Sequence, residues 1–314
     1  MCEYPGEGVL SPGPESRADR LPPRGVSPGP GIVPRRPERT PRAAARRSLV
    51  RATGFDRIWL VERRTLVLTI DVEPDWGVEG WLAVEETVGF LVEQLGATGS
   101  GATCFTTGLL ARERPGIVRE LAQVAEIGSH GLSHRRLDKL PRLEVEGELR
   151  LSRDMLQDTV GEVLGVRAPF FATPPDWLDL ARETGYRYDA SRGFLVPSQG
   201  AVPWRDEPLV SVVNGFPVFA VGTMCESIFG ALPMSLFYLR SSGPFWKWLL
   251  PAEPRLMFLH PHELSETAPI PFGGIKGFLL GRGRGRRART IFSHILSRYR
   301  CISCKQFLLE RGQL

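Results

Sequence analysis

Short apolar runs alternate with amphipathic stretches between Thr65 and Ser191, and this alternation limits the fold more than any other feature of the sequence. TLVLTI and GATCFTT are rich in β-branched residues and predict buried strands. AVEETVGFLVEQLG and PGIVRELAQVAE carry apolar residues at helical spacing and predict helices. Because strands alternate with helices, we expect parallel β/α units, arranged either as a barrel or as a doubly wound sheet.

The alternation of predicted strands and helices continues further along the chain and then becomes less regular. A long helix is predicted from about Leu143 to Leu164, and a helix ending at Gly185 follows the strand VRAPFFA. YRYDAS, PLVSVV, FPVFAV and RLMFLH predict further strands, the last three within more irregular sequence. The C-terminal part predicts a glycine- and arginine-rich loop, an amphipathic helix and a short tail. We therefore divide the chain into a tail (1–55), a main folded domain (56–275) and a C-terminal segment that packs on it (276–314).

The N-terminal tail differs from the rest in composition. Residues 1–55 are rich in proline, arginine and glycine and lack a periodic apolar pattern, so we expect them to be disordered. Residues 1–64 hold 13 arginines against 7 acidic residues, although the whole chain has a formal charge of only +5. The remainder is therefore nearly neutral, and no nucleic-acid partner is expected.

Targeting and redox signals are sparse. No apolar signal-peptide region follows Met1, and no apolar run reaches the roughly 18 residues of a membrane span, so a cytoplasmic protein without a transmembrane segment is expected. The five cysteines are an odd number and form no dense framework, as in reducing compartments. Cys301 and Cys304 have the CxxC spacing, but no second pair completes a zinc site, so packing is the preferred interpretation.

Polar groups gather where the predicted strands end. Because the carboxyl ends of parallel strands lie on one face, groups far apart in sequence are expected to meet there. Four of the five histidines have such positions. The residues concerned are Asp71, Glu73, Asp75, His130, His134, Arg167, Asp189, His260, His262 and Glu263.

Two imidazoles and one carboxylate are a common ligand set for catalytic zinc. His130 and His134 converge if their segment turns helically, since side chains four residues apart then lie on one face. Ser129 and Ser133 are placed to steer the rings or to cap the turn. The alternative is that each histidine only forms hydrogen bonds within a loop. The co-occurrence of this pair with the acidic and histidine-bearing strand ends favours the metal site.

These blocks resemble the polysaccharide deacetylase family of carbohydrate esterases, which remove acetyl groups from sugars. TIDVE is similar to the family's first motif in its DVE variant, GATCFTTG to the following strand, and EIGSHGLSH to the HxxxH block. RAPFF and FLHPHEL resemble two later motifs, so that the resemblance runs from about Leu66 to Leu264. It implies a distorted (β/α) barrel of the deacetylase type, bound to a divalent metal ion, most commonly Zn²⁺.

The resemblance also implies roles for single residues. Asp71 would be the general base and His260 the general acid. His130 and His134 would bind the metal together with Glu73, because Val72 occupies the position of the usual ligand.

Asp75 is the alternative third ligand. Arg167 would orient the base Asp71, and Asp189 would help to fix Arg167. Phe170 replaces the usual tyrosine, whose backbone N–H serves as an oxyanion donor in the family. His262 and Glu263 are expected to support the site.

Three functions remain open at this point. The first is metal-dependent removal of acetyl groups from an N-acetylated sugar or polysaccharide by activated water, and the second is hydrolysis of small non-peptide amides or cyclic imides. The third is an inactive descendant that binds glycans. Core packing is the default for Trp76, Trp81 and Trp177, with stacking on a sugar ring as the alternative. The sequence carries no sign of the oligomeric state.

Overall fold

The computed structural model describes residues 64–75, 80–193, 208–227 and 230–314. The chain divides into Met1–Ile58 and Trp59–Leu314, and all described residues belong to the second unit. The predicted disorder of residues 1–55 and the position of Trp76 lie outside the described residues.

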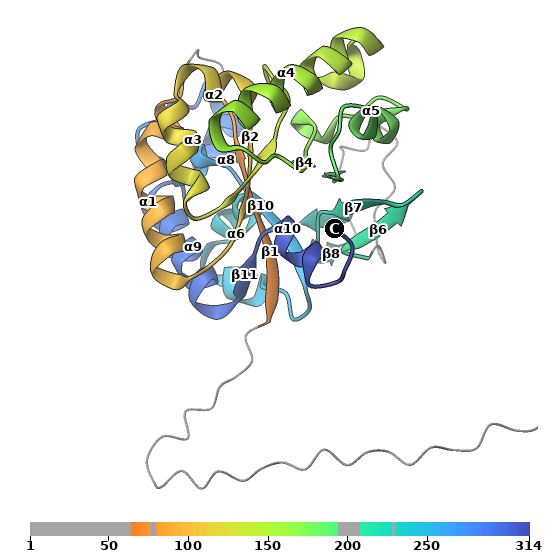
Figure 1. The fold of residues 1–314 in the computed structure, drawn as a ribbon. Coiled ribbons are helices and arrows are strands. Elements are labelled where there is room, and N and C mark those ends of the chain that lie inside the picture. Colours follow the sequence, from red (N-terminus) through yellow and green to blue (C-terminus); the bar gives the residue numbers. More distant parts are fainter. Residues whose placement is uncertain (1–63, 76–79, 194–207, 228–229) are drawn as a thin grey trace, which may run out of the picture. The chain divides into compact units, whose positions relative to one another are not determined.

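A curled sheet, in which β1 is the second strand from one end, organises the described part of the chain (Figure 1). The strand order is β10-β1-β2-β3-β4-β5-β7-β6, and β11 also pairs with β1. Every pairing along this path is parallel except that of β6 with β7. The strands are β1 Thr65–Val72, β2 Thr103–Thr106, β3 Glu126–Ser129, β4 Gly165–Val166, β5 Tyr188–Arg192, β6 Val210–Val213, β7 Phe216–Ala220, β10 Arg255–Leu259 and β11 Arg300–Ile302, with a separate hairpin of β8 Thr223–Ser227 and β9 Gly230–Pro233.

The helices surround this sheet, with α1, α3 and α9 along one side of it (Figure 1). The helix α1 buries Val84, Val88, Leu91 and Leu95 at helical spacing, as the sequence predicts. The predicted α/β fold, a distorted (β/α) barrel, is confirmed. The helices are α1 Leu82–Thr98, α2 Gly108–Glu113, α3 Pro115–Ala122, α4 Arg142–Val160, α5 Trp177–Glu183, α6 Leu236–Ser241, α7 Pro261–Leu264, α8 Gly274–Gly281, α9 Arg286–Arg298 and α10 Cys304–Leu309, with 3₁₀ turns at Leu137–Lys139, Pro169–Phe171 and Gly243–Leu249.

The structure departs from the sequence prediction in several segments. The expected strand VRAPFFA overlaps β4 only at Val166 and then enters the 3₁₀ turn, because Phe170 and Phe171 adopt positive φ values of 59° and 55° that no strand contains. The C-terminal segment holds more than a short tail. Its residues Arg300–Ile302 form β11, which pairs in parallel with Thr65–Val67 beside β2. The side chains of Cys301 and Cys304 are buried, in agreement with a packing role.

Glu86 on α1 stabilises the loop that follows α7 through hydrogen bonds. Its carboxylate accepts hydrogen bonds from the Ser265 hydroxyl (2.5 Å), from the Glu266 and Thr267 amides (2.8 and 3.1 Å) and from the Thr267 hydroxyl (2.6 Å). Burial by itself would raise the pKa of this carboxyl, but these donors lower it to about 2. Glu86 is therefore ionised in the folded protein and stabilises the loop in that form.

Replacing Glu86 with glutamine should lower the free energy of unfolding by about 1–3 kcal/mol at neutral pH. Because the folded-state pKa lies below the ordinary value of 4.5, this stabilisation is complete above that value and is lost as the pH falls toward 2. The difference between wild type and variant in urea denaturation should thus shrink on acidification. Glu93→Gln, at an exposed position of the same helix, is the matched control. A difference that stays constant with pH would contradict this assignment.

None of the helices in the described ranges is long and apolar enough to cross a membrane.

Candidate active site

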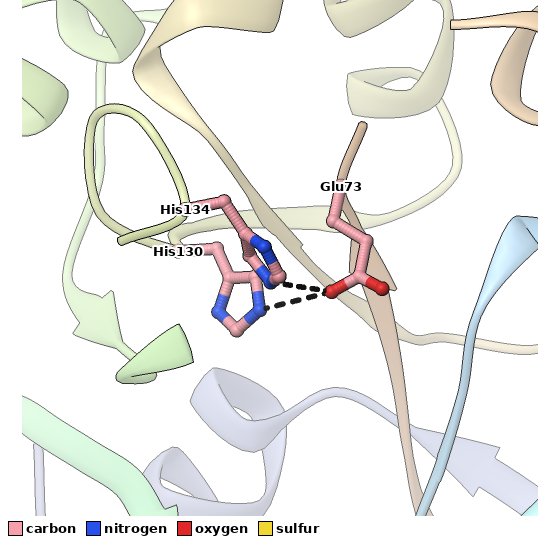
Figure 2. A group of neighbouring side chains, drawn as sticks. All are labelled: Glu73, His130 and His134. Carbon is pink, nitrogen blue, oxygen red and sulfur yellow. Dashed lines mark ion pairs between the residues drawn. The ribbon is translucent and has the colours of Figure 1, made fainter. Parts of the chain in front are cut away.

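Glu73, His130 and His134 come together at the carboxyl ends of β1 and β3 (Figure 2). The Nε2 atoms of His134 and His130 lie 2.6 and 3.7 Å from Oε2 of Glu73. One ligand atom from each of the three residues lies within 4.8 Å of those of the other two. Both rings extend from the loop after β3 toward the carboxylate at the end of β1. The structure thus brings together the three residues that the sequence nominated as metal ligands.

The two histidines converge through a left-handed turn rather than the expected helical one. Gly131 and His134 have φ values of 72° and 59°, so the chain folds back immediately after β3. The Ser129 hydroxyl accepts a hydrogen bond from the Gly131 amide (3.3 Å), which caps the turn.

Glu148 of α4 holds the outer side of this turn. Its carboxylate accepts hydrogen bonds from the Leu132 and Ser133 amides (2.9 and 3.0 Å) and from the Ser133 hydroxyl (2.5 Å). The sequence pattern did not single out Glu148. An acidic residue within the apolar stripe of α4, next to Val145 and Leu149, was the available signal.

The chemistry of these side chains fits a divalent cation. The Nδ1 atom of His130 lies 2.9 Å from the Arg167 carbonyl, and this hydrogen bond leaves Nε2 of His130 as the acceptor facing Glu73. The Nε2 atom of His134 is buried and has no hydrogen-bond partner of good geometry in the described part of the chain, despite its proximity to Glu73. Buried polar atoms are rarely left without a partner unless they bind an ion or water. Two imidazole nitrogens and a carboxylate suit zinc and several other divalent metals.

Asp71 and Arg167 form a buried ion pair beside this cluster. The Nη1 atom of Arg167 donates to Oδ1 of Asp71 (2.6 Å) and to the Thr69 hydroxyl (2.8 Å). The guanidinium lies over the Phe105 ring, 4.4 Å from its centroid. Both charged side chains are almost fully buried, so the orientation of the Asp71 carboxylate is fixed.

Asp189 lies close to Arg167 but binds other groups. Its carboxylate accepts hydrogen bonds from Nε1 of Trp177 (2.9 Å) and from the Ser191 amide and hydroxyl. Nε of Arg167 donates to the Ala190 carbonyl of the same strand (2.9 Å). Asp189 therefore fixes the strand that receives Arg167, and it acts on the guanidinium itself through charge. Burial raises the pKa of this carboxyl.

His260 occupies the opposite side of the cluster. Its Nε2 atom lies 3.9 Å from Oδ2 of Asp71 and 3.9 Å from Oε1 of Glu73. Its Nδ1 atom faces Oε1 of Glu263 at 3.4 Å, and its backbone amide donates to the same oxygen at 3.2 Å. Burial by itself would lower the pKa of His260, but Glu73, Glu263 and Asp71 together raise it to about 9.

Glu263 is held from behind by Arg240, a residue that no sequence motif identified. Nε of Arg240 donates to Oε2 of Glu263 (3.0 Å), and the two side chains are 0% and 1% exposed. The other guanidinium nitrogens of Arg240 donate to the carbonyls of Leu280 (2.8 Å) and Arg282. Burial would raise the pKa of Glu263, but His260 and Arg240 lower it to about 2, so Glu263 is ionised. Arg240 lies in irregular sequence 23 residues before its partner, which explains why no pattern revealed it.

His262 and Asp75 stand at the edge of the cluster. The His262 ring stacks on that of His260, with centroids 4.8 Å apart, and burial together with the charge on His260 lowers its pKa to about 3. The Asp75 carboxylate accepts hydrogen bonds from the Leu82 and Ala83 amides (2.6 and 3.0 Å), where α1 begins. Asp75 thus caps a helix, and Glu73 is the acidic residue that meets the histidines.

A cavity of about 590 Å³ opens onto these residues. Phe170, which is half exposed, contacts the His134 ring with centroids 4.6 Å apart. Trp81 and Trp177 are buried, and their indole nitrogens bond Glu113 and Asp189, so both pack in the core. The apolar residues that line the cavity are Pro74, Phe170, Phe171, Phe258, Phe272 and Leu280.

Comparison with known proteins agrees with the motifs and the fold. A family model for polysaccharide deacetylase matches residues 61–188, which confirms the resemblance seen in the motifs. Comparison with curated proteins gave no match.

Among solved structures, a Mycobacterium smegmatis protein named as a putative polysaccharide deacetylase is similar in fold, with a TM-score of 0.54 at 18% identity over 81% of this chain and 93% of that one. The peptidoglycan deacetylase PdaC from Bacillus subtilis matches with a TM-score of 0.48 at 15% identity, over 80% and 93% of the two chains. A CE4 family pseudoenzyme from Bacillus anthracis also has a TM-score of 0.48, at 12% identity over 79% and 66%.

Proposed function

We propose that this protein is a metal-dependent hydrolase that removes acetyl groups from an N-acetylated sugar or polysaccharide. The observation that carries the proposal is the grouping of Asp71 and His260 around the Glu73–His130–His134 cluster, with all five residues lining one cavity. These groups supply a base, an acid and a metal-binding set, which are the elements that amide hydrolysis requires. The polysaccharide deacetylase match over residues 61–188 supports the same class of reaction.

Asp71 has the position of the general base. A divalent cation bound by Glu73, His130 and His134 would polarise the acetyl carbonyl and make a water molecule more acidic. The Asp71 carboxylate accepts the proton of the attacking water, and Oδ2 is the oxygen left for this task because Arg167 binds Oδ1. Arg167 keeps the carboxylate aimed at the cavity throughout.

His260 has the position of the general acid. Its Nε2 atom points toward Asp71 and Glu73, so a proton at this atom reaches the departing nitrogen on the side opposite to the histidine pair. Glu263 accepts from Nδ1 and fixes the ring, while Arg240 fixes Glu263. An amine leaves poorly without protonation, so this step matters more for N-acetyl than for O-acetyl substrates.

The test combines metal analysis with product detection. The purified protein should contain about one divalent ion per chain and should release acetate from acetylated chito-oligosaccharides. An Asp71→Asn variant that is prepared alongside should keep the ion and lose the acetate signal. Release of acid or ammonia from cyclic imides without acetate release from sugars would instead indicate an amide or imide hydrolase. Sugar binding without metal uptake would indicate a binding protein and would refute the proposal.

Replacing Glu263 with glutamine should slow hydrolysis of N-acetyl sugars by about 100-fold or more. It should slow hydrolysis of an activated aryl acetate much less, because an aryl oxide leaves without a proton. A purely structural role would lower both activities equally. Steady-state kinetics on the two substrates, with thermal unfolding to check that the variant folds, measures the ratio. Glu266→Gln, at an exposed position three residues further on, should leave both rates unchanged.

A further inference from the structure

The helix α8 forms one wall of the cavity but packs poorly against the rest of the protein. Phe272, Lys276 and Leu280, spaced four residues apart, line the cavity. None of the residues of α8 is buried. On its other side Ile275, Phe278 and Leu279 are 79%, 67% and 46% exposed. The helix thus presents apolar side chains to the outside, directly beside the cavity.

A bound sugar does not account for these exposed side chains. Phe278 has a ring on which a sugar can stack, but Ile275 and Leu279 are aliphatic and gain little from a hydrated, hydroxyl-rich ligand. Contiguous apolar side chains on a surface mark contact with a protein, a membrane or a ligand.

The charges around α8 distinguish between these partners. No acidic residue occurs between Glu266 and Glu310 in the sequence, whereas nine lysines and arginines do. Lys276, Arg282 and Arg286 are exposed, and within the described ranges their side chains form no ion pair. Arg284 and Arg289, by contrast, donate to backbone carbonyls of α7 and of the loop after it and stabilise the fold. Lys276, Arg282 and Arg286 are thus three exposed cations without an acidic partner in the described ranges, and they lie in α8 or shortly after it, where they complement an anionic partner.

The structure holds α8 in a fixed relation to the catalytic residues. Arg240 donates to the carbonyls of Leu280 and Arg282 at the end of α8, and the same guanidinium binds Glu263, which fixes His260. A partner that binds α8 consequently meets the rim of the cavity.

We propose that α8 and the cations beside it dock the protein on an anionic membrane surface, with the cavity opening toward the lipid headgroups. Exposed Ile, Phe and Leu side chains with neighbouring Lys and Arg residues are the composition of segments that lie in a membrane interface. Apolar side chains enter the headgroup region while the cations bind lipid phosphates. If the deacetylase function proposed above holds, the substrate class is an acetylated sugar attached to a membrane lipid.

Flotation of the full chain with vesicles tests the docking directly. The protein should float with vesicles of phosphatidylcholine and phosphatidylglycerol, should bind phosphatidylcholine alone much less, and should dissociate as the salt concentration rises. The triple variant Ile275→Ser, Phe278→Ser, Leu279→Ser should lower binding by about tenfold or more. Arg282→Gln with Arg286→Gln should remove most of the preference for phosphatidylglycerol. Every variant retains the arginines of residues 1–64, so a loss of binding is due to α8.

Leu143→Ser is the matched control, since Leu143 is an 81% exposed apolar residue on α4. It should bind vesicles like the wild type. The triple variant should keep its metal and its rate on a soluble acetylated chito-oligosaccharide, because the three side chains face away from the cavity. Wild-type binding that persists in the triple variant would overturn the proposal. The proposal would also be overturned if the wild-type protein did not bind vesicles but formed a dimer that the triple variant did not form. If the protein deacetylated no substrate, the proposed function would be refuted, whereas vesicle binding would still support docking through α8.

Discussion

Replacing His130 with alanine should remove the bound divalent ion and nearly all hydrolytic activity. His130 would supply one of the three proposed ligand atoms, and its other ring nitrogen is fixed by the Arg167 carbonyl. Loss of a residue that only supports a ligand already costs about 10–100-fold in metal affinity, so loss of the ligand itself should exceed that range. Mass spectrometry of the metal content, together with the rate of acetate release, measures both effects.

The control for this experiment is His294→Ala. His294 packs on Trp246 and belongs to α9, away from the cluster. It should keep a full complement of metal, and so should His262→Ala, which removes a ring that stacks on His260 but is not one of the three ligands. A wild-type metal content in His130→Ala would refute the ligand assignment.

Replacing Asp71 with asparagine should slow turnover by about 10²–10⁴-fold while the metal stays bound. Asparagine keeps an oxygen to accept from Arg167 and keeps the shape of the side chain, but it cannot take a proton from water. The Michaelis constant should change little, since in the proposed mechanism Asp71 acts on the water rather than on the sugar. Kinetics of the metal-loaded variant provide the measurement.

A loss of folding is the alternative cause to exclude for this variant. Arg167 is fully buried, so a neutral partner leaves its charge less well compensated and costs stability. Thermal unfolding separates this cost from the catalytic loss. Turnover within a few-fold of the wild type in a folded protein would show that Asp71 is not the base.

The residues that meet at the strand ends could be predicted from the sequence because two simple rules apply to them. Short β-branched runs specify buried strands, and the residues immediately after parallel strands all lie on one face of the sheet. Asp71, His130 and His260 therefore met as expected. The choice between Glu73 and Asp75 was not predictable from spacing, because it depends on the direction in which the chain leaves β1. The structure shows that Asp75 turns back to cap α1.

Interactions that span irregular sequence escaped prediction for a different reason. Arg240 and Glu263 have no periodic relation, and only the 3.0 Å contact between their buried side chains shows that they form a pair. The left-handed conformation of His134 was equally hidden, since Gly131 was the only residue in that turn with an evident preference for positive φ. Periodicity reports on regular elements, whereas these groups depend on the conformations of single residues.

The pairing of β11 with the beginning of β1 makes the first and last described strands depend on each other. During synthesis, Thr65–Val67 emerge from the ribosome long before Arg300–Ile302 exist, so this side of β1 stays open until β11 has been made. Native folding should accordingly finish only after β11 has left the ribosome, and a version that ends at residue 275 should aggregate. Extensions placed after Leu314, where the chain is exposed, should leave folding unaffected.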